Sequence, residues 1–108
     1  MSETLEETLA ALADPNRRRV VELLCDQPYT AGELAREIGL SPAALSRHLR
    51  VLKSIGMIAE VPLYSDARLR AYALRPQPMA DLKTWVTTNE ERWTRQMETL
   101  ARRATSRS

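Results

Sequence analysis

Apolar positions in the first quarter of the chain recur every three to four residues, which is the spacing of one face of an α-helix. Leu5, Leu9 and Leu12 predict a first amphipathic helix over residues 3–13. The run NRRRVVELLC predicts a second helix, with Asp14 as a capping residue at its start. Its expected inward positions are Val20, Val21, Leu24 and Cys25. We therefore expect the Cys25 side chain to be a small buried hydrophobic group, with a redox-active thiol, which would have to be exposed, as the alternative.

Two further helices are marked by capping signals. The TAGE motif that begins at Thr30 is a capping box, and the helix that it opens ends at Gly39. A fourth helix follows from the cap at Ser41 to the terminating Gly56. Because only three residues separate the third and fourth helices, we predict a helix-turn-helix over residues 30–56.

The hydrophobic period changes from helical to alternating after the fourth helix. MIAEVPL (57–63) and RLRAYAL (68–74) predict two strands joined by the turn YSDA. Pro62 places the first strand at an edge or interrupts it. We predict a β-hairpin wing over residues 57–75, followed by the proline-containing linker RPQP (75–78).

A long helix is predicted for the last part of the chain, over residues 79–104. One stripe along it is apolar, and Trp85 lies beside that stripe. The members of the stripe are Leu82, Val86, Trp93, Met97, Leu100 and Ala104. A chain of this size has little core for so long a stripe to cover, so we expect it to pack against a second copy, with packing inside its own chain as the alternative.

These elements predict one domain over residues 1–108. The fold class is mainly α with a small β-hairpin, a winged helix-turn-helix in the order α-α-α-α-β-β-α. The chain has a single cysteine, no apolar run long enough to span a membrane, and an acidic N-terminus unlike a signal peptide. We expect a cytoplasmic protein.

Charge is distributed unevenly along the chain. Residues 1–40 contain eight acids and four arginines, whereas residues 41–75 contain six bases and two acids. The fourth helix contains no acid at all. An acid on this helix would repel phosphate, so the pattern favours a surface that faces a polyanion, with an ordinary solvated charged face as the alternative.

DNA contacts are predicted from the fourth helix and the wing. The first turns of such a helix meet base edges in the major groove, and Arg47 suits guanine. The predicted base-reading residues are Ser41, Ala43, Ala44, Ser46 and Arg47. The predicted DNA-backbone residues are His48, Arg50, Lys53, Arg68 and Arg70. For His48 a structural hydrogen bond is an equal alternative to a phosphate contact.

Three consecutive arginines occupy the first turn of the second helix, where cations oppose the helix dipole. Local pairing, such as Arg18 with Glu22, compensates for this, or at least one arginine reaches phosphate. Two tyrosines carry similar alternatives. Tyr29 precedes a helix cap and is expected to pack there, with a DNA contact as the alternative. Tyr64 in the hairpin turn either packs or touches DNA.

The segments LADPNRRRVVELL and TAGELAREIGLSPAALSRHLRVLKSIGMI, followed by a hairpin leading to AYALRP, resemble the ArsR family of bacterial winged-helix repressors. The resemblance covers roughly residues 5–76. It implies a nucleoid-associated homodimer, paired through the first and last helices and bound to an imperfect palindrome in double-stranded promoter DNA. The predicted dimer-interface residues are Leu5, Leu9, Leu82, Trp85, Val86, Trp93, Met97 and Leu100.

Metal sensing is common in that family, through paired cysteines near the helix-turn-helix or through acids and histidines on the last helix. Here the stretch GELAREIGL contains no cysteine, and the last helix contains no histidine. We expect no metal, no cofactor and a place in the non-metal-sensing branch. One histidine and one cysteine also give no nucleophile with a base, so no enzyme is predicted. The alternative function is a winged-helix protein-interaction module.

Overall fold

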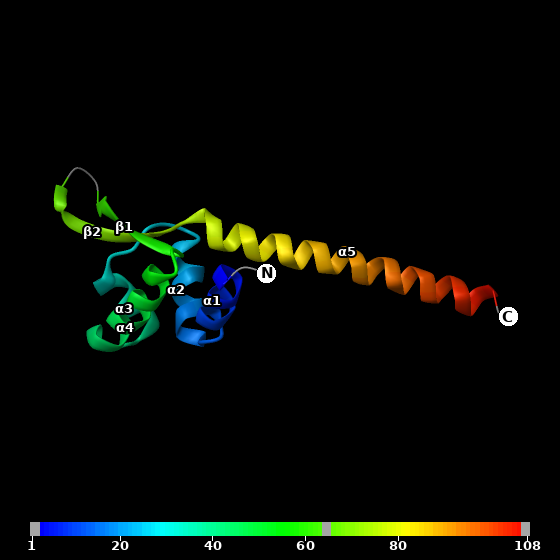
Figure 1. Ribbon diagram of the computed structural model, residues 1–108. Coiled ribbons are helices and arrows are strands. Elements are labelled where there is room, and N and C mark those ends of the chain that lie inside the picture. Colours follow the sequence, from blue (N-terminus) through cyan, green and yellow to red (C-terminus); the bar gives the residue numbers. More distant parts are fainter. Residues whose placement is uncertain (1–2, 64–65, 107–108) are drawn as a thin grey trace.

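The computed structural model describes residues 3–63 and 66–106 of the chain. Within these residues, five helices and one two-stranded antiparallel sheet follow in the predicted order, as Figure 1 shows. They are α1 (Glu3–Leu12), α2 (Pro15–Leu24), α3 (Ala31–Ile38), α4 (Pro42–Ser54), β1 (Ile58–Leu63), β2 (Asp66–Leu74) and α5 (Pro76–Ser106). The predicted fold class is confirmed.

Local capping fixes where α3 begins and ends. The Thr30 hydroxyl accepts a hydrogen bond from the Glu33 backbone N–H at 3.2 Å, and the Glu33 carboxylate accepts one from the Thr30 N–H at 2.9 Å. Gly39 ends the helix with φ of 80°, a conformation that glycine adopts without strain. These interactions satisfy helix-end amides that have no partner inside the helix, and they confirm the predicted capping box.

The core lies where α2, α3 and α4 meet under the hairpin. Its most buried large side chains include Val20, Leu34, Leu45, Leu52 and Ile58. These residues come from every element of the helix-turn-helix unit and from the first strand, so α4 is anchored along its whole inner face. Burial of such side chains supplies most of the stability of a small fold.

The hairpin is anchored at its base and irregular towards its tip. Ile58 pairs with Leu74, and the register shifts between Pro62 and Leu63. This irregularity confirms the interruption that Pro62 predicts. The predicted turn residue Tyr64 lies outside the described residues.

Tyr29 pairs with the sheet through its backbone. Its N–H donates to the Tyr72 carbonyl at 3.2 Å, and the Tyr72 N–H donates to the Tyr29 carbonyl at 2.8 Å. The Tyr29 ring packs against the core, as predicted. The segment before α3 therefore holds β2 from its second side, a pairing that the sequence pattern did not reveal.

Helix α5 begins at Pro76, so the prediction of a linker over 75–78 is wrong. Proline is tolerated in the first turn of a helix, since the amide that it lacks would have had no intrahelical partner. The helix projects far beyond the rest of the molecule (Figure 1), and the chain measures 69 × 26 × 25 Å.

The prediction for Cys25 is also wrong, because this side chain is exposed. Cys25 follows the last helical residue as the C-cap of α2. Leu23 and Leu24 occupy the inward positions instead, three and four residues after Val20. One further residue turns the side chain by about 100° out of the apolar face.

Candidate nucleic-acid interface

The outward face of α4 is basic and contains no acid. Leu45, Leu49 and Leu52 are buried on the inner face of this helix. Arg47 and Arg50 lie on the opposite face, and both are exposed. Packing of the leucine stripe therefore fixes which side of α4 the two arginines occupy.

The other predicted base-reading residues surround the N-terminal end of α4. The Ser41 hydroxyl accepts a hydrogen bond from the Ala44 N–H at 3.2 Å and caps the helix. Ala43 and Ser46 are exposed, and Ala44 is half-buried. Small side chains at these positions leave the helix end open to close approach by another surface.

Lys53 is engaged by the hairpin. Its Nζ lies 3.3 Å from Oε1 of Glu60 on β1, and Glu60 also accepts a hydrogen bond from the Tyr72 hydroxyl at 3.2 Å. The Lys53 hydrogen bond and charge, with the Tyr72 hydrogen bond, hold the pKa of Glu60 below its usual value. Burial and the Glu60 charge raise the pKa of Tyr72. The sequence reading missed Glu60 as a partner of a predicted DNA-backbone residue.

His48 lies half-buried at the edge of the core, where its Nδ1 is 3.4 Å from a terminal nitrogen of Arg17. The Arg17 Nε donates to the Ala11 carbonyl at 2.7 Å. Arg18 donates to the Leu12 carbonyl at 2.7 Å. These arginines thus satisfy the last carbonyls of α1, which offsets their unfavourable position at the start of α2.

The predicted Arg18–Glu22 pair is wrong. Glu22 instead lies 3.6 Å from Arg19, three residues away. Both side chains are exposed, so this pair contributes little to stability.

Arg68 and Arg70 are exposed on β2, in the part of the hairpin beyond its anchored base. Figure 1 shows the hairpin extending from the side of the molecule that carries α3 and α4, away from the free end of α5. The predicted base-reading helix and the predicted wing therefore belong to the same end of the molecule.

Most of the predicted dimer-interface side chains are exposed in the single chain. Trp93, the most exposed of them, is 61% exposed. The others that are exposed are Leu9, Trp85, Val86, Met97 and Leu100, whereas Leu82 is half-buried. Leu5 is only 4% exposed, so its own chain already covers it and it offers almost no surface to a second copy.

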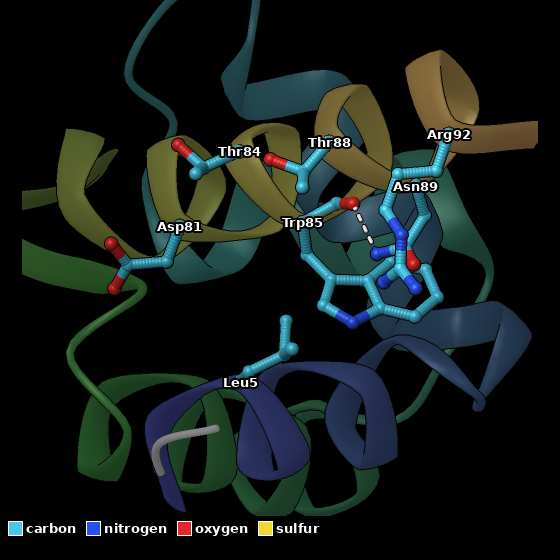
Figure 2. A pocket seen from close by; sticks show the side chains of 7 residues that line it. All are labelled: Leu5, Asp81, Thr84, Trp85, Thr88, Asn89 and Arg92. Atoms are coloured by element: carbon cyan, nitrogen blue, oxygen red, sulfur yellow. Dashed lines mark hydrogen bonds between the residues drawn. The ribbon is translucent and has the colours of Figure 1, made fainter. Parts of the chain in front are cut away.

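A groove separates α1 from the first half of α5 (Figure 2). Leu5 lines the groove on the α1 side, and the Trp85 indole extends from α5 towards Leu5. Asn89 donates to the Trp85 carbonyl at 2.8 Å within α5. The remaining residues that line the groove are Asp81, Thr84, Thr88 and Arg92, so Trp85 is the apolar residue that α5 contributes to it.

Two results concern other kinds of site. Among residues 3–63 and 66–106, no three His, Cys, Asp or Glu side chains are grouped closely enough to hold a metal ion. In the same part of the chain, no helix combines the length and apolar character that a membrane crossing requires.

The protein-family model described as "Bacterial regulatory protein, arsR family" matches residues 14–60 of this chain. A solved structure titled "Crystal structure of Possible transcriptional regulator for arsenical resistance" is 35% identical, with a TM-score of 0.62, and the match covers 82% of this chain and 84% of that one. This chain belongs to the ArsR family. The matched segment of this ArsR-family chain runs from the cap of α2 into β1 and includes every predicted base-reading residue.

Two curated relatives of the ArsR-family chain are named as regulators. "HTH-type transcriptional regulator Rv2034" of Mycobacterium tuberculosis is 42% identical over 74 residues, or 68% of this chain and 66% of that protein. "Transcriptional repressor SdpR" of Bacillus subtilis is 27% identical over 82 residues, or 76% of this chain and 88% of that protein. The chain thus spans just under two thirds of the first relative's length.

Proposed function

We propose that this chain is a sequence-specific DNA-binding transcriptional regulator that acts as a dimeric repressor at a palindromic promoter operator. The observation that carries the proposal is the acid-free outer face of α4, on which Arg47 and Arg50 are exposed opposite a buried leucine stripe. The family match over residues 14–60 and a relative named as a repressor support it.

In the proposed complex, α4 enters the major groove and is the recognition helix. Its first turns present Ser46 and Arg47 to base edges, while Arg50 lies one turn further on, towards the phosphates. Arg68 and Arg70 on the wing contact the flanking backbone. Lys53 contributes to backbone binding when phosphate competes with Glu60 for its ammonium group.

Dimerisation is proposed to occur through α1 and α5, with residues 1–108 acting as one domain. Helix α5 has 31 residues, and its apolar stripe is exposed along most of its length. A second copy related by a two-fold axis would cover the same stripe on both chains. Such a dimer would present its recognition helices to successive major grooves about 34–36 Å apart.

We place the protein in the bacterial cytoplasm, associated with the nucleoid, and in the branch of the family that does not sense metals. A soft or borderline metal requires several Cys or His ligands. The single histidine of this chain contacts Arg17, and the single cysteine caps α2. No cofactor is required for DNA binding of this kind.

The test is binding to duplexes from the protein's own promoter region and to random duplexes, measured by fluorescence anisotropy over a salt series. We expect affinity for one promoter segment to exceed that for random DNA by at least about 10³-fold, with log K falling steeply against log salt. A flat salt response would contradict the proposal and favour a protein-interaction module. Equal affinity for all sequences would remove the specific repressor function.

A further inference from the structure

We infer that Arg17 and His48 form a joint that sets the rotation of the recognition helix α4 relative to α1, so that Arg17 is a positioning residue for base reading. The inference rests on the proposed function, because it concerns the helix that is proposed to read DNA. It gives His48 a different role from the phosphate contact that the sequence also allowed.

Arg17 is fixed first by α1. It lies in the first turn of α2, and its Nε donates to the Ala11 carbonyl at 2.7 Å. One terminal nitrogen lies 3.4 Å from the Ala10 carbonyl. Both carbonyls belong to the last turn of α1, where they have no partner within the helix and where the dipole attracts a cation.

The second terminal nitrogen of Arg17 reaches α4. It lies 3.4 Å from Nδ1 of His48, a residue 31 positions away in the sequence. All three guanidinium nitrogens therefore have protein partners, which leaves Arg17 poorly placed to bind phosphate. Because an arginine can only donate, a hydrogen bond at this contact requires Nδ1 of His48 to be the acceptor.

The position of His48 beside Arg47 links this contact to base reading. His48 directly follows Arg47, so a contact that holds its ring also restrains the turn of α4 from which Arg47 extends. Side-chain atoms lie about 5–6 Å from a helix axis, so a rotation of about 10° would move them by about 1 Å. A bidentate contact to guanine is sensitive to displacements of that size.

Asp14 supports the same joint from the start of α2. Its carboxylate accepts hydrogen bonds from the backbone N–H groups of Asn16 at 2.8 Å and Arg17 at 3.2 Å. The Arg17 backbone hydrogen bond is the main cause that holds the pKa of Asp14 below its usual value, and the Asn16 hydrogen bond and the Arg17 charge act in the same direction. The carboxylate thus helps to fix the turn from which the Arg17 side chain extends.

Arg18 provides a matched control. Its guanidinium also donates to the last carbonyls of this region, those of Leu12 at 2.7 Å and Ala13 at 3.1 Å. Both substitutions remove one charge and a set of contacts to the end of α1, but only Arg17→Ala removes the recorded contact to α4. Operator and random-duplex affinities, salt slopes, dimer dissociation and thermal unfolding are to be measured for both variants.

We expect Arg17→Ala to weaken operator binding about 10-fold more than Arg18→Ala does, with a smaller loss on random DNA and a wild-type salt slope. His48→Asn places an oxygen near the position of Nδ1 and should keep most of the affinity, whereas His48→Ala should not. In a double-mutant cycle, Arg17→Ala and His48→Ala should be strongly non-additive.

Several outcomes would overturn the joint. Equal losses for the two arginine variants would do so, and so would additive losses in the cycle. A salt slope lowered by about 1, with equal loss on all sequences, would make Arg17 a phosphate contact instead. In each case the wild-type protein still discriminates its operator, whereas failure of the proposed function appears as wild-type protein without that discrimination.

Nuclear magnetic resonance of the imidazole nitrogens tests the joint without DNA. At neutral pH we expect Nδ1 of His48 to be unprotonated and its nitrogen shift to change in Arg17→Ala but not in Arg18→Ala. A proton on Nδ1 in the wild-type protein would contradict the assigned contact.

Discussion

Lys53 and Glu60 form an ion pair, 3.3 Å from Nζ to Oε1, that ties the recognition helix to the first strand of the wing. Tyr72 donates to the same carboxylate oxygen from the second strand. This arrangement sets the wing against α4, and it also places one acid beside a cation of the proposed DNA surface. If Lys53 binds DNA, a DNA phosphate therefore has to replace the Glu60 carboxylate as the partner of its ammonium group.

Glu60→Gln should strengthen DNA binding and steepen its salt dependence. The substitution removes the competing charge, so Lys53 becomes available to phosphate and the log–log slope should become more negative by about 1. The gain should be similar on operator and random DNA, because phosphates carry no sequence information. Glu98→Gln on the distant part of α5 makes the same charge change and is the control. Equal slopes for the two variants would show that Lys53 does not contact DNA.

Thr30→Ala should destabilise the fold without changing the DNA surface directly. The loss of the hydroxyl acceptor at the start of α3 costs about 1 kcal/mol, which denaturant unfolding measures as a lower midpoint at constant slope. Thr94→Ala, at an exposed position inside α5, is the control and should leave the midpoint nearly unchanged. An unchanged midpoint for Thr30→Ala would mean that the capping box contributes nothing.

Stability should fall on acidification. Hydrogen bonds to their charged forms lower the pKa values of Asp14, Glu33 and Glu60 in the folded chain. A depressed pKa contributes stability above the unfolded value, and that contribution disappears as the pH falls through the folded value. The free energy of unfolding should therefore decrease from about pH 5 downwards, as measured by urea midpoints at successive pH values.

Asp14→Asn isolates the contribution of Asp14 to this pH dependence, because asparagine still caps a helix but does not titrate. We expect this variant to lose less stability than the wild-type protein between pH 5 and lower values. Asp26→Asn, at an exposed position after α2, is the charge control. A wild-type pH dependence in Asp14→Asn would exclude Asp14 from the acid response.

The features that were predicted best are those that depend only on residues close together in the sequence. The capping box at Thr30, the glycine stop at Gly39 and the cap at Ser41 each depend on residues within a few positions of one another. Burial of one face of α4 followed from the spacing of its leucines. These features fixed the helix-turn-helix and the outward direction of Arg47.

Contacts between distant elements were not predictable from spacing. Arg17 meets His48 only because α2 packs against α4, and Tyr29 pairs with Tyr72 only because the fold brings the segment before α3 beside β2. The prediction that Cys25 is buried failed because the apolar run continues one residue beyond the end of α2. The prolines after Arg75 resembled a linker, although a first helical turn accepts them.

Trp93→Glu should disrupt self-association without unfolding the chain. Trp93 is 61% exposed in one chain, so a charge there costs the monomer little but would be buried in the proposed α5 interface. Sedimentation velocity should show a wild-type dimer and a monomeric variant, with unchanged helical circular dichroism. Thr94→Glu, on the adjacent helical position, is the control for added charge. A wild-type monomer, or a variant that remains dimeric, would contradict the proposed interface.

The central claim is that the acid-free face of α4 reads base sequence, and Arg47 tests it most directly. The measurement is the ratio of operator to random-duplex affinity at one salt concentration, for the wild-type protein, Arg47→Ala and Arg68→Ala. We predict that Arg47→Ala lowers this ratio by an amount that corresponds to about 1–3 kcal/mol of binding free energy. Arg68→Ala should weaken both affinities and leave the ratio nearly unchanged. An unchanged ratio in Arg47→Ala, or the same effect in both variants, would contradict base reading by this helix.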